Sequence, residues 1–134
     1  MKGFRLPFLN VSADVRNAPF HDFDPFMRHC VDYAMPVGTP VVAVRAGVVS
    51  LVLDGHPETQ EDPKNADLCN VVEIRHGKEL SSVYAHLDEI LVCTGQKVAA
   101  GDVIGKSGQS GFATYPHLHF GLYKNGESVR FEGR

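Results

Sequence analysis

The stretch HLHFGLY at residues 117–123 alternates polar and apolar side chains with the period of a β-strand. Side chains two residues apart in a strand leave the same face, about 6.5–7 Å from each other, so His117 and His119 share one face. Leu118 and Phe120 then share the opposite face, which we expect to be buried. The stretch therefore predicts a strand with one core face and one face that carries two imidazoles.

Elsewhere in the chain, short runs rich in Val and Ile recur and are separated by turn residues, which is typical of an all-β domain. Further strands are expected at residues 41–53, interrupted at Gly47, and at residues 70–76, 82–87 and 98–105. The turn at residues 77–79 predicts a hairpin, and residues 124–126 predict a closing turn. Polar residues 1–28 and 54–69 are expected to be surface loops. No long segment has the helical period, so we expect a mainly β, antiparallel fold with little or no helix.

Composition and charge limit the classes of function. The chain has 134 residues, of which 43% are hydrophobic, and this favours one soluble globular domain. Its net charge is −3 and it has no basic run, so we expect no nucleic-acid partner. Since no run of eighteen apolar residues occurs, we expect no membrane span. Three cysteines are an odd number, which favours buried free thiols over a disulfide framework.

A third histidine lies in the alternating run SSVYAHL at residues 81–87, whose period places Ser82, Tyr84 and His86 on one face. If this strand neighbours residues 117–123, three histidines converge. Neighbouring imidazoles repel when both are charged, and metal binding removes that conflict because a ligand must be neutral. A catalytic zinc usually has three protein ligands and one open position. Asp32, which lies between apolar residues just before a turn, is the candidate carboxylate ligand.

The chain also contains, in this order, VDYAMPVGTPVVAVRAGVV, NVVEIRHG, YAHL, GQKVAAGDVIGKSGQSG and PHLHF. This series resembles the lysostaphin-type (LytM-like) zinc endopeptidases of bacterial cell walls over about residues 21–123. The resemblance implies an antiparallel β-sheet or sandwich, similar to a duplicated hybrid motif, and one Zn²⁺ per chain. It implies that Asp32 and His119 are zinc ligands and that His86 and His117 are unligated catalytic histidines.

The first zinc ligand leaves two alternatives. The family usually carries a histidine four residues before the aspartate, where this chain has Arg28. Some relatives place the ligand further upstream and carry an aromatic residue where His29 stands, and by that comparison His21 is the ligand. His29 is an odd number of residues from Asp32, so the two would face opposite sides of an extended strand. We favour His21 and retain His29 as the alternative.

The resemblance implies a zinc-dependent endopeptidase that hydrolyses stem or cross-bridge peptides of peptidoglycan through a metal-activated water. Arg28 motivates an alternative, a non-catalytic module that binds the cell wall or activates another hydrolase. A third interpretation is a phosphocarrier resembling the sugar-phosphotransferase IIA type, which also uses two facing histidines. The enzyme is favoured because a module without chemistry has no need for Asp32, His86, His117 and His119 together. Tyr115 stands where the family usually has glycine, and it either narrows the substrate groove or packs.

We expect one metallopeptidase domain over residues 1–134, with residues 1–20 as an N-terminal extension and a catalytic core at about 21–125. Pro7 and Asn10 interrupt the first apolar stretch before a signal-peptide core could form. The sequence therefore predicts no export by the ordinary route, whereas the resemblance implies action outside the cytoplasm. We expect a monomer whose partner is a peptidoglycan peptide.

Overall fold

The computed structural model describes residues 4–9, 11–15, 28–55, 69–109 and 115–131, and these residues form strands, turns and connections with no helix. The strands are β1 (Asp14–Val15), β2 (Val31–Ala34), β3 (Pro40–Val42), β4 (Gly47–Leu53), β5 (Val71–Arg75), β6 (Leu80–Ala85), β7 (Leu87–Ile90), β8 (Lys97–Val98), β9 (Val103–Ser107), β10 (His117–Lys124) and β11 (Glu127–Val129). All of their pairings are antiparallel. The predicted mainly β, antiparallel fold is confirmed.

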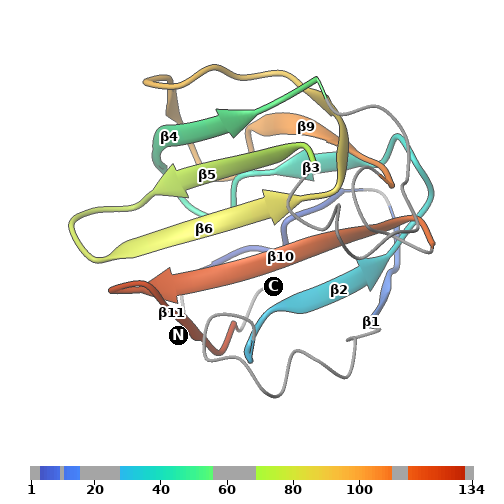
Figure 1. The fold of residues 1–134 in the computed structure, drawn as a ribbon, viewed down its shortest axis with the longest axis horizontal. Coiled ribbons are helices and arrows are strands. Elements are labelled where there is room, and N and C mark those ends of the chain that lie inside the picture. The colour runs from blue at the N-terminus through green and yellow to red at the C-terminus, as the bar shows by residue number, and fades with distance from the viewer. Residues whose placement is uncertain (1–3, 10, 16–27, 56–68, 110–114, 132–134) are drawn as a thin grey trace.

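The strands form two sheets that pack against each other. The larger sheet has the order β1-β2-β10-β6-β5-β4-β8, with β11 paired to β10, and the smaller has the order β3-β9-β7. Figure 1 shows the small sheet behind β4, β5 and β6 of the large one. The core lies between them and includes Val41, Ile74, Tyr84, Leu87, Ile104, Leu118 and Phe120. Only one face of β10 is used for this core, which leaves its other face for a site.

The predicted hairpin and the predicted break at Gly47 are both confirmed. Residues of β5 and β6 pair across the turn at Gly77. The run at residues 41–53 divides into β3 and β4, and β4 begins at Gly47. A Cβ at Gly47 would collide with the Arg75 carbonyl oxygen and approach Ile74 Cγ2 to 2.7 Å. Glycine is required here because β5 passes too close for any side chain.

The run at residues 98–105 is not the single strand that the sequence predicted. It begins at the last residue of β8, on the edge of the large sheet, and ends within β9, in the centre of the small sheet. Gly101 separates the two with a φ of +90°, a left-handed conformation that glycine adopts without steric cost. The chain can therefore change sheets at this point.

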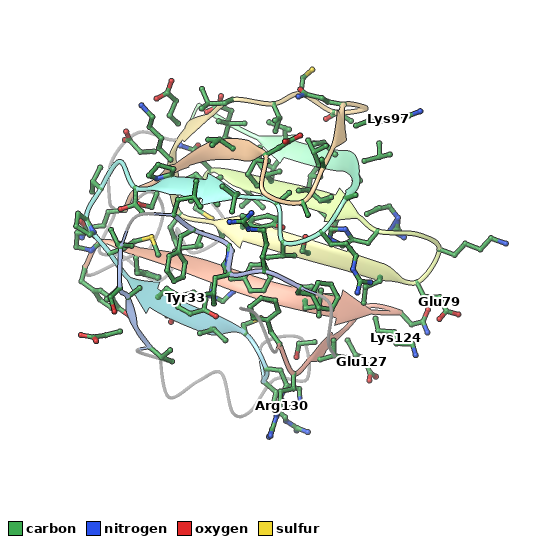
Figure 2. The ribbon with its side chains drawn as sticks, turned by 180° about the vertical axis from the view of Figure 1, so that it is seen from behind. Tyr33, Glu79, Lys97, Lys124, Glu127 and Arg130 are labelled. Atoms are coloured by element: carbon green, nitrogen blue, oxygen red, sulfur yellow. The ribbon has the colours of Figure 1, made fainter. Side chains whose placement is uncertain are left out.

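The closing turn at residues 124–126 is confirmed. Asn125 and Gly126 have φ values of 52° and 83°, and they connect β10 to β11. Figure 2 shows charged Glu79, Lys124 and Glu127 at the end of the sheet where this turn and the β5–β6 turn lie. The opposite end of β10, where His117 begins the strand, holds the candidate site.

The prediction that residues 1–28 form a surface loop is wrong for the part that the structure describes. Phe4 and Phe8 belong to the core. Phe8 forms a β-bridge with Val41, and its ring lies edge-on to Tyr33 at 5.0 Å between centroids. The two aromatic side chains attach this segment to the core. The segment has no hydrophobic periodicity, so its sequence gives no signal that these residues are buried. Most of the expected loop at 54–69 lies outside the described residues. Cys69, its last residue, is described and is buried.

None of the three cysteines, all within the described residues, forms a disulfide, but only two are buried as predicted. Cys30 and Cys69 are buried, whereas Cys93 is exposed in the connection between β7 and β8. Among the described residues, none forms a helix of the length and apolarity that a membrane crossing needs.

Candidate active site

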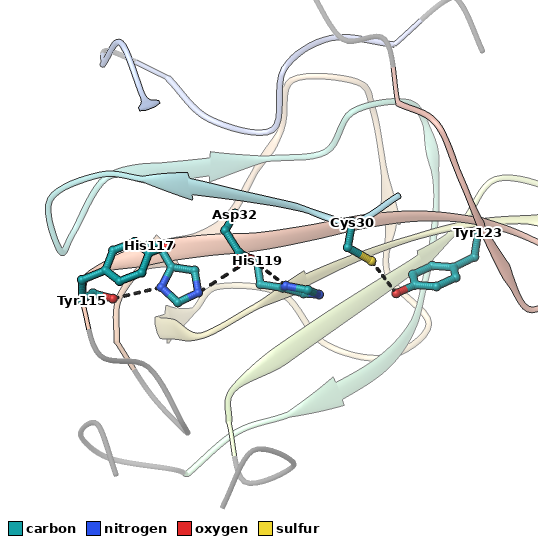
Figure 3. Close-up of polar contacts among 6 residues, drawn as sticks. All are labelled: Cys30, Asp32, Tyr115, His117, His119 and Tyr123. Carbon is teal, nitrogen blue, oxygen red and sulfur yellow. Dashed lines mark hydrogen bonds and ion pairs between the residues drawn. The ribbon is translucent and has the colours of Figure 1, made fainter. Parts of the chain in front are cut away.

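Asp32 of β2 and His119 of β10 form the centre of the site. They are directly opposite each other in the β2–β10 register, so their side chains leave the same face of the sheet. His119 Nδ1–H donates to Asp32 Oδ1 at 2.8 Å, as drawn in Figure 3. Asp32 is 4% exposed and His119 is 9% exposed. The structure thus brings together two of the predicted ligands as a buried pair.

His117 lies next to this pair on the same face, as the alternation in residues 117–123 predicted. Its Nε2 is 3.9 Å from Asp32 Oδ1. Its Nδ1 is 2.9 Å from the backbone carbonyl oxygen of Tyr115. The Tyr115 ring also stacks on the His117 ring, with centroids 4.6 Å apart. A carbonyl oxygen can only accept, so Nδ1 carries the proton and Nε2 is the unprotonated nitrogen of the neutral ring. His117 therefore presents a lone pair beside Asp32.

The alternation predicted for residues 82–86 is wrong in part. Tyr84 does not share a face with the site histidines, because it pairs with Phe120 in the β6–β10 register and its ring lies edge-on to Phe120 in the core. Ser82 is fully buried, and its hydroxyl donates to Tyr84 Oη at 2.8 Å. Strand parity would place His86 in the core as well.

His86 nevertheless reaches the site. It follows the last residue of β6 and has a φ of 63°, which is uncommon for a residue with a side chain. Its ring centroid is 4.6 Å from that of His117 and 6.0 Å from that of His119. The left-handed backbone breaks the alternation and turns the imidazole to the site face, so the predicted convergence of three histidines occurs for a different reason.

The two histidines of β10 are held in different protonation states. Burial alone would lower the pKa of His119, but its hydrogen bonds with Asp32 and Cys30 and the Asp32 charge raise it to about 9. Burial lowers the pKa of His117 and the nearby His119 charge adds to this, against smaller upward effects of the Tyr115 carbonyl and Asp32. In the metal-free protein at neutral pH, His119 is therefore a cation paired with Asp32, and His117 is neutral.

The donor atoms present fit part of a zinc site. Neighbouring ligand atoms of tetrahedral zinc lie about 3.4 Å apart, and the Asp32 and His119 atoms already face each other at a similar separation. Within the described ranges, no group of three or more His, Cys, Asp or Glu residues is placed to hold a metal ion. His21, the predicted third ligand, lies outside those ranges. His29, the alternative, is partly buried, and its backbone N–H donates to Oγ of Ser128 in β11.

One neighbour of the site, Tyr123, was not predicted from the sequence. Tyr123 lies on the same face as His119, and its hydroxyl is 3.0 Å from the thiol of Cys30. The signal was present, because Tyr123 is four residues after His119 in a strand and Cys30 has the parity of Asp32.

Comparisons with known proteins agree with this arrangement. The sequence model of peptidase family M23 matches residues 27–131. Peptidoglycan DD-endopeptidase ShyA of Vibrio cholerae is 40% identical over 118 residues, which are 81% of this chain and 25% of that protein. The chain thus spans about a quarter of the length of this curated relative.

Solved structures show the same fold. A zinc-containing peptidase from Vibrio cholerae superposes with a TM-score of 0.73 at 26% identity, covering 99% of this chain and 41% of that one. The catalytic domain of lysostaphin from Staphylococcus simulans superposes with a TM-score of 0.60 at 29% identity, covering 78% of this chain and 75% of that one. From its sequence and its fold, the chain belongs to peptidase family M23.

Proposed function

We propose that the chain is a zinc-dependent endopeptidase that hydrolyses stem or cross-bridge peptides of bacterial peptidoglycan. Membership of a peptidase family and similarity to a peptidoglycan DD-endopeptidase support this proposal. The observation that carries it is the buried Asp32–His119 pair with the rings of His117 and His86 beside it. Because peptidoglycan lies outside the cytoplasmic membrane, the proposed place of action is extracytoplasmic.

Asp32 and His119 would hold the zinc, with His21 as the third protein ligand. His29 is three residues before Asp32, so in an extended strand the two side chains would face opposite sides, which favours His21 over His29. When bound, zinc supplies a Lewis acid that activates water and polarises the scissile carbonyl group.

His117 and His86 would carry the proton transfers. His117 Nε2, with its free lone pair, accepts a proton from the attacking water, and the Tyr115 carbonyl keeps the ring in the required tautomer. The same nitrogen can return the proton to the leaving amine. His86, whose ring neighbours that of His117, would donate a hydrogen bond to the oxyanion. Since His117 is neutral near pH 7, it is ready to act as a base without prior deprotonation.

A second candidate is a module that binds cell wall without cutting it. Arg28, which stands where the family usually carries its first zinc ligand, is exposed and motivates this alternative. The endopeptidase would cleave peptidoglycan peptides, whereas the module would only bind the cell wall. A chain that binds zinc but cleaves no peptidoglycan peptide would favour the module.

The ligand set is tested by elemental analysis of zinc per chain in the wild type, His21→Ala and His29→Ala, purified without chelator. We expect one zinc in the wild type and in His29→Ala, and none in His21→Ala. Loss of zinc only in His29→Ala would identify His29 as the third ligand. A wild type that takes up no zinc, even after incubation with it, would contradict the proposed enzyme.

A further inference from the structure

A buried thiol lies beside the proposed zinc ligands, and the proposed mechanism does not use it. Cys30 immediately precedes β2 and is 1% exposed. Its Sγ lies 3.0 Å from the hydroxyl oxygen of Tyr123, and it also hydrogen-bonds with His119. Figure 3 shows Asp32, His119, Cys30 and Tyr123 following one another along the face of β10.

The hydrogen bond between Cys30 and His119 can be assigned to atoms. His119 Nδ1 faces Asp32 Oδ1, so Nε2 is the nitrogen left for the thiol. If Nδ1 binds a metal, the neutral imidazole carries its remaining proton on Nε2, and that buried N–H needs an acceptor. The sulfur of Cys30 can accept this N–H. In the contact between Cys30 and Tyr123, either the S–H or the phenol O–H is the donor.

Gly121 makes room for this contact. It lies between His119 and Tyr123 on the same face of β10. A Cβ at this position would come within 2.8 Å of both Cys30 Sγ and the Tyr123 hydroxyl oxygen. The thiol and the phenol thus meet in the space that the missing side chain leaves. The contact depends on Cys30, Gly121 and Tyr123 together. A cysteine that is buried only because it is apolar would not need the other two.

We propose that Cys30 is a positioning residue of the metal site. Its sulfur accepts the Nε2–H of His119 and keeps Nδ1 turned toward Asp32, while Tyr123 holds the sulfur in place. Partners of this kind fix the tautomer and ring orientation of metal-binding histidines. The inference rests on the proposed function, since it requires that His119 binds zinc. Cys30 acts as a partner and not as a ligand, because within the described part of the chain it forms no metal-binding group with Asp32 and His119.

The test is the zinc dissociation constant of the full chain, measured by competition with a chromophoric chelator. We expect Cys30→Ala to bind zinc about 10- to 100-fold more weakly than the wild type, the range typical for loss of such a partner. Cys30→Ser retains an acceptor for Nε2–H and is expected to bind zinc within a few-fold of the wild type. Equal loss of affinity in both variants would contradict a role as hydrogen-bond acceptor.

Two tyrosine variants separate positioning from stability. Tyr123→Phe removes the hydroxyl that holds Cys30 and is expected to weaken zinc binding. Tyr84→Phe is the matched control, because its buried hydroxyl contacts Ser82 and the Val44 N–H on the core side of the sheet. We expect it to lower stability and leave zinc affinity unchanged. If Tyr84→Phe weakens zinc binding as much as Tyr123→Phe does, the effect is general and the proposal fails.

The outcomes distinguish this inference from the proposed function. A wild type that binds no zinc contradicts the proposed function itself. A wild type that binds one zinc, with Cys30→Ala binding it equally well, overturns only the role of Cys30. Cobalt substitution adds a spectroscopic check, and we expect no thiolate-to-cobalt charge-transfer band. A band that Cys30→Ala abolishes would make Cys30 a metal ligand and contradict positioning.

Discussion

The imidazole rings of His86 and His117 lie 4.6 Å apart between centroids, although strand parity would place His86 on the opposite face of the sheet. The backbone of His86 makes this possible with a φ of 63°. A left-handed conformation at a residue with a side chain costs about 1–3 kcal/mol and persists only where its surroundings enforce it. This strain at the edge of a histidine cluster indicates that the position of His86 serves the site.

His86→Asn and His117→Ala are expected to retain zinc and to lower kcat/KM by about 10²- to 10⁴-fold, the range for a lost acid or base. Asparagine tolerates the left-handed conformation, so His86→Asn removes the imidazole without adding backbone strain. Steady-state cleavage of a muropeptide and zinc content are measured on the same samples. Turnover at the wild-type rate in either variant would remove that residue from the mechanism.

Asp32→Ala and His119→Ala are expected to lose zinc and with it all turnover, because each removes one of the two donors that face each other in the site. Elemental analysis of the purified proteins checks this. His56 lies in the polar run at residues 54–69 and belongs to no proposed set of site residues, so His56→Ala serves as a control that is expected to keep both zinc and activity. Cleavage by a metal-free variant would contradict the proposed mechanism.

The stability of the metal-free protein is expected to depend on the proton of His119. Despite burial, which lowers it, the pKa of His119 is about 9, above its ordinary value of 6.5, because Asp32 and Cys30 hydrogen-bond to it. The folded state therefore holds this proton more tightly than the unfolded chain does. The resulting stability is complete below about pH 6.5 and is lost as the pH rises through about 9.

Urea unfolding in the presence of chelator tests this dependence. The wild type should exceed His119→Gln in free energy of unfolding by more at pH 6 than at pH 9.5. A difference that grows with pH would contradict the assignment. Because zinc must displace the same proton, its apparent affinity for the wild type is expected to rise between pH 6.5 and 9.

Tyr115→Ala is expected to lower kcat by about 3- to 10-fold with zinc retained, since the ring that stacks on His117 is worth about 0.5–1.5 kcal/mol. The backbone carbonyl remains, so the tautomer of His117 is unchanged. Separate measurement of kcat and KM decides between two roles. An altered KM with unchanged kcat would mean that Tyr115 shapes the substrate groove instead of supporting His117.

Sequence periodicity predicted the arrangement of β10 because alternation holds wherever a strand is regular. Leu118 and Phe120 are core residues, and His117 and His119 share the other face. The same rule failed at Tyr84, because the alternation is interrupted at His86 and parity cannot be carried across a left-handed residue. Local backbone conformation of this kind has no signature in the pattern of polar and apolar residues.

Contacts between distant parts of the chain were also beyond sequence reasoning. Phe4 and Phe8 occupy the core from an irregular segment, and only the fold shows which apolar residues of that segment are buried. The contact between Cys30 and Tyr123 joins residues 93 positions apart. The positions of both residues in their strands are compatible with a shared face, but only the fold shows the space that Gly121 leaves for their contact. The choice of His21 over His29 as a ligand stays a prediction.

Zinc-dependent cleavage of peptidoglycan is tested by incubating the full chain with purified peptidoglycan muropeptides, with zinc and after chelation, and identifying the products by mass spectrometry. We expect fragments that differ from the substrate by hydrolysis of one peptide bond. They should be absent after chelation and restored when zinc is added back. Intact muropeptides after prolonged incubation with a zinc-loaded wild type would show that the chain is not the proposed endopeptidase.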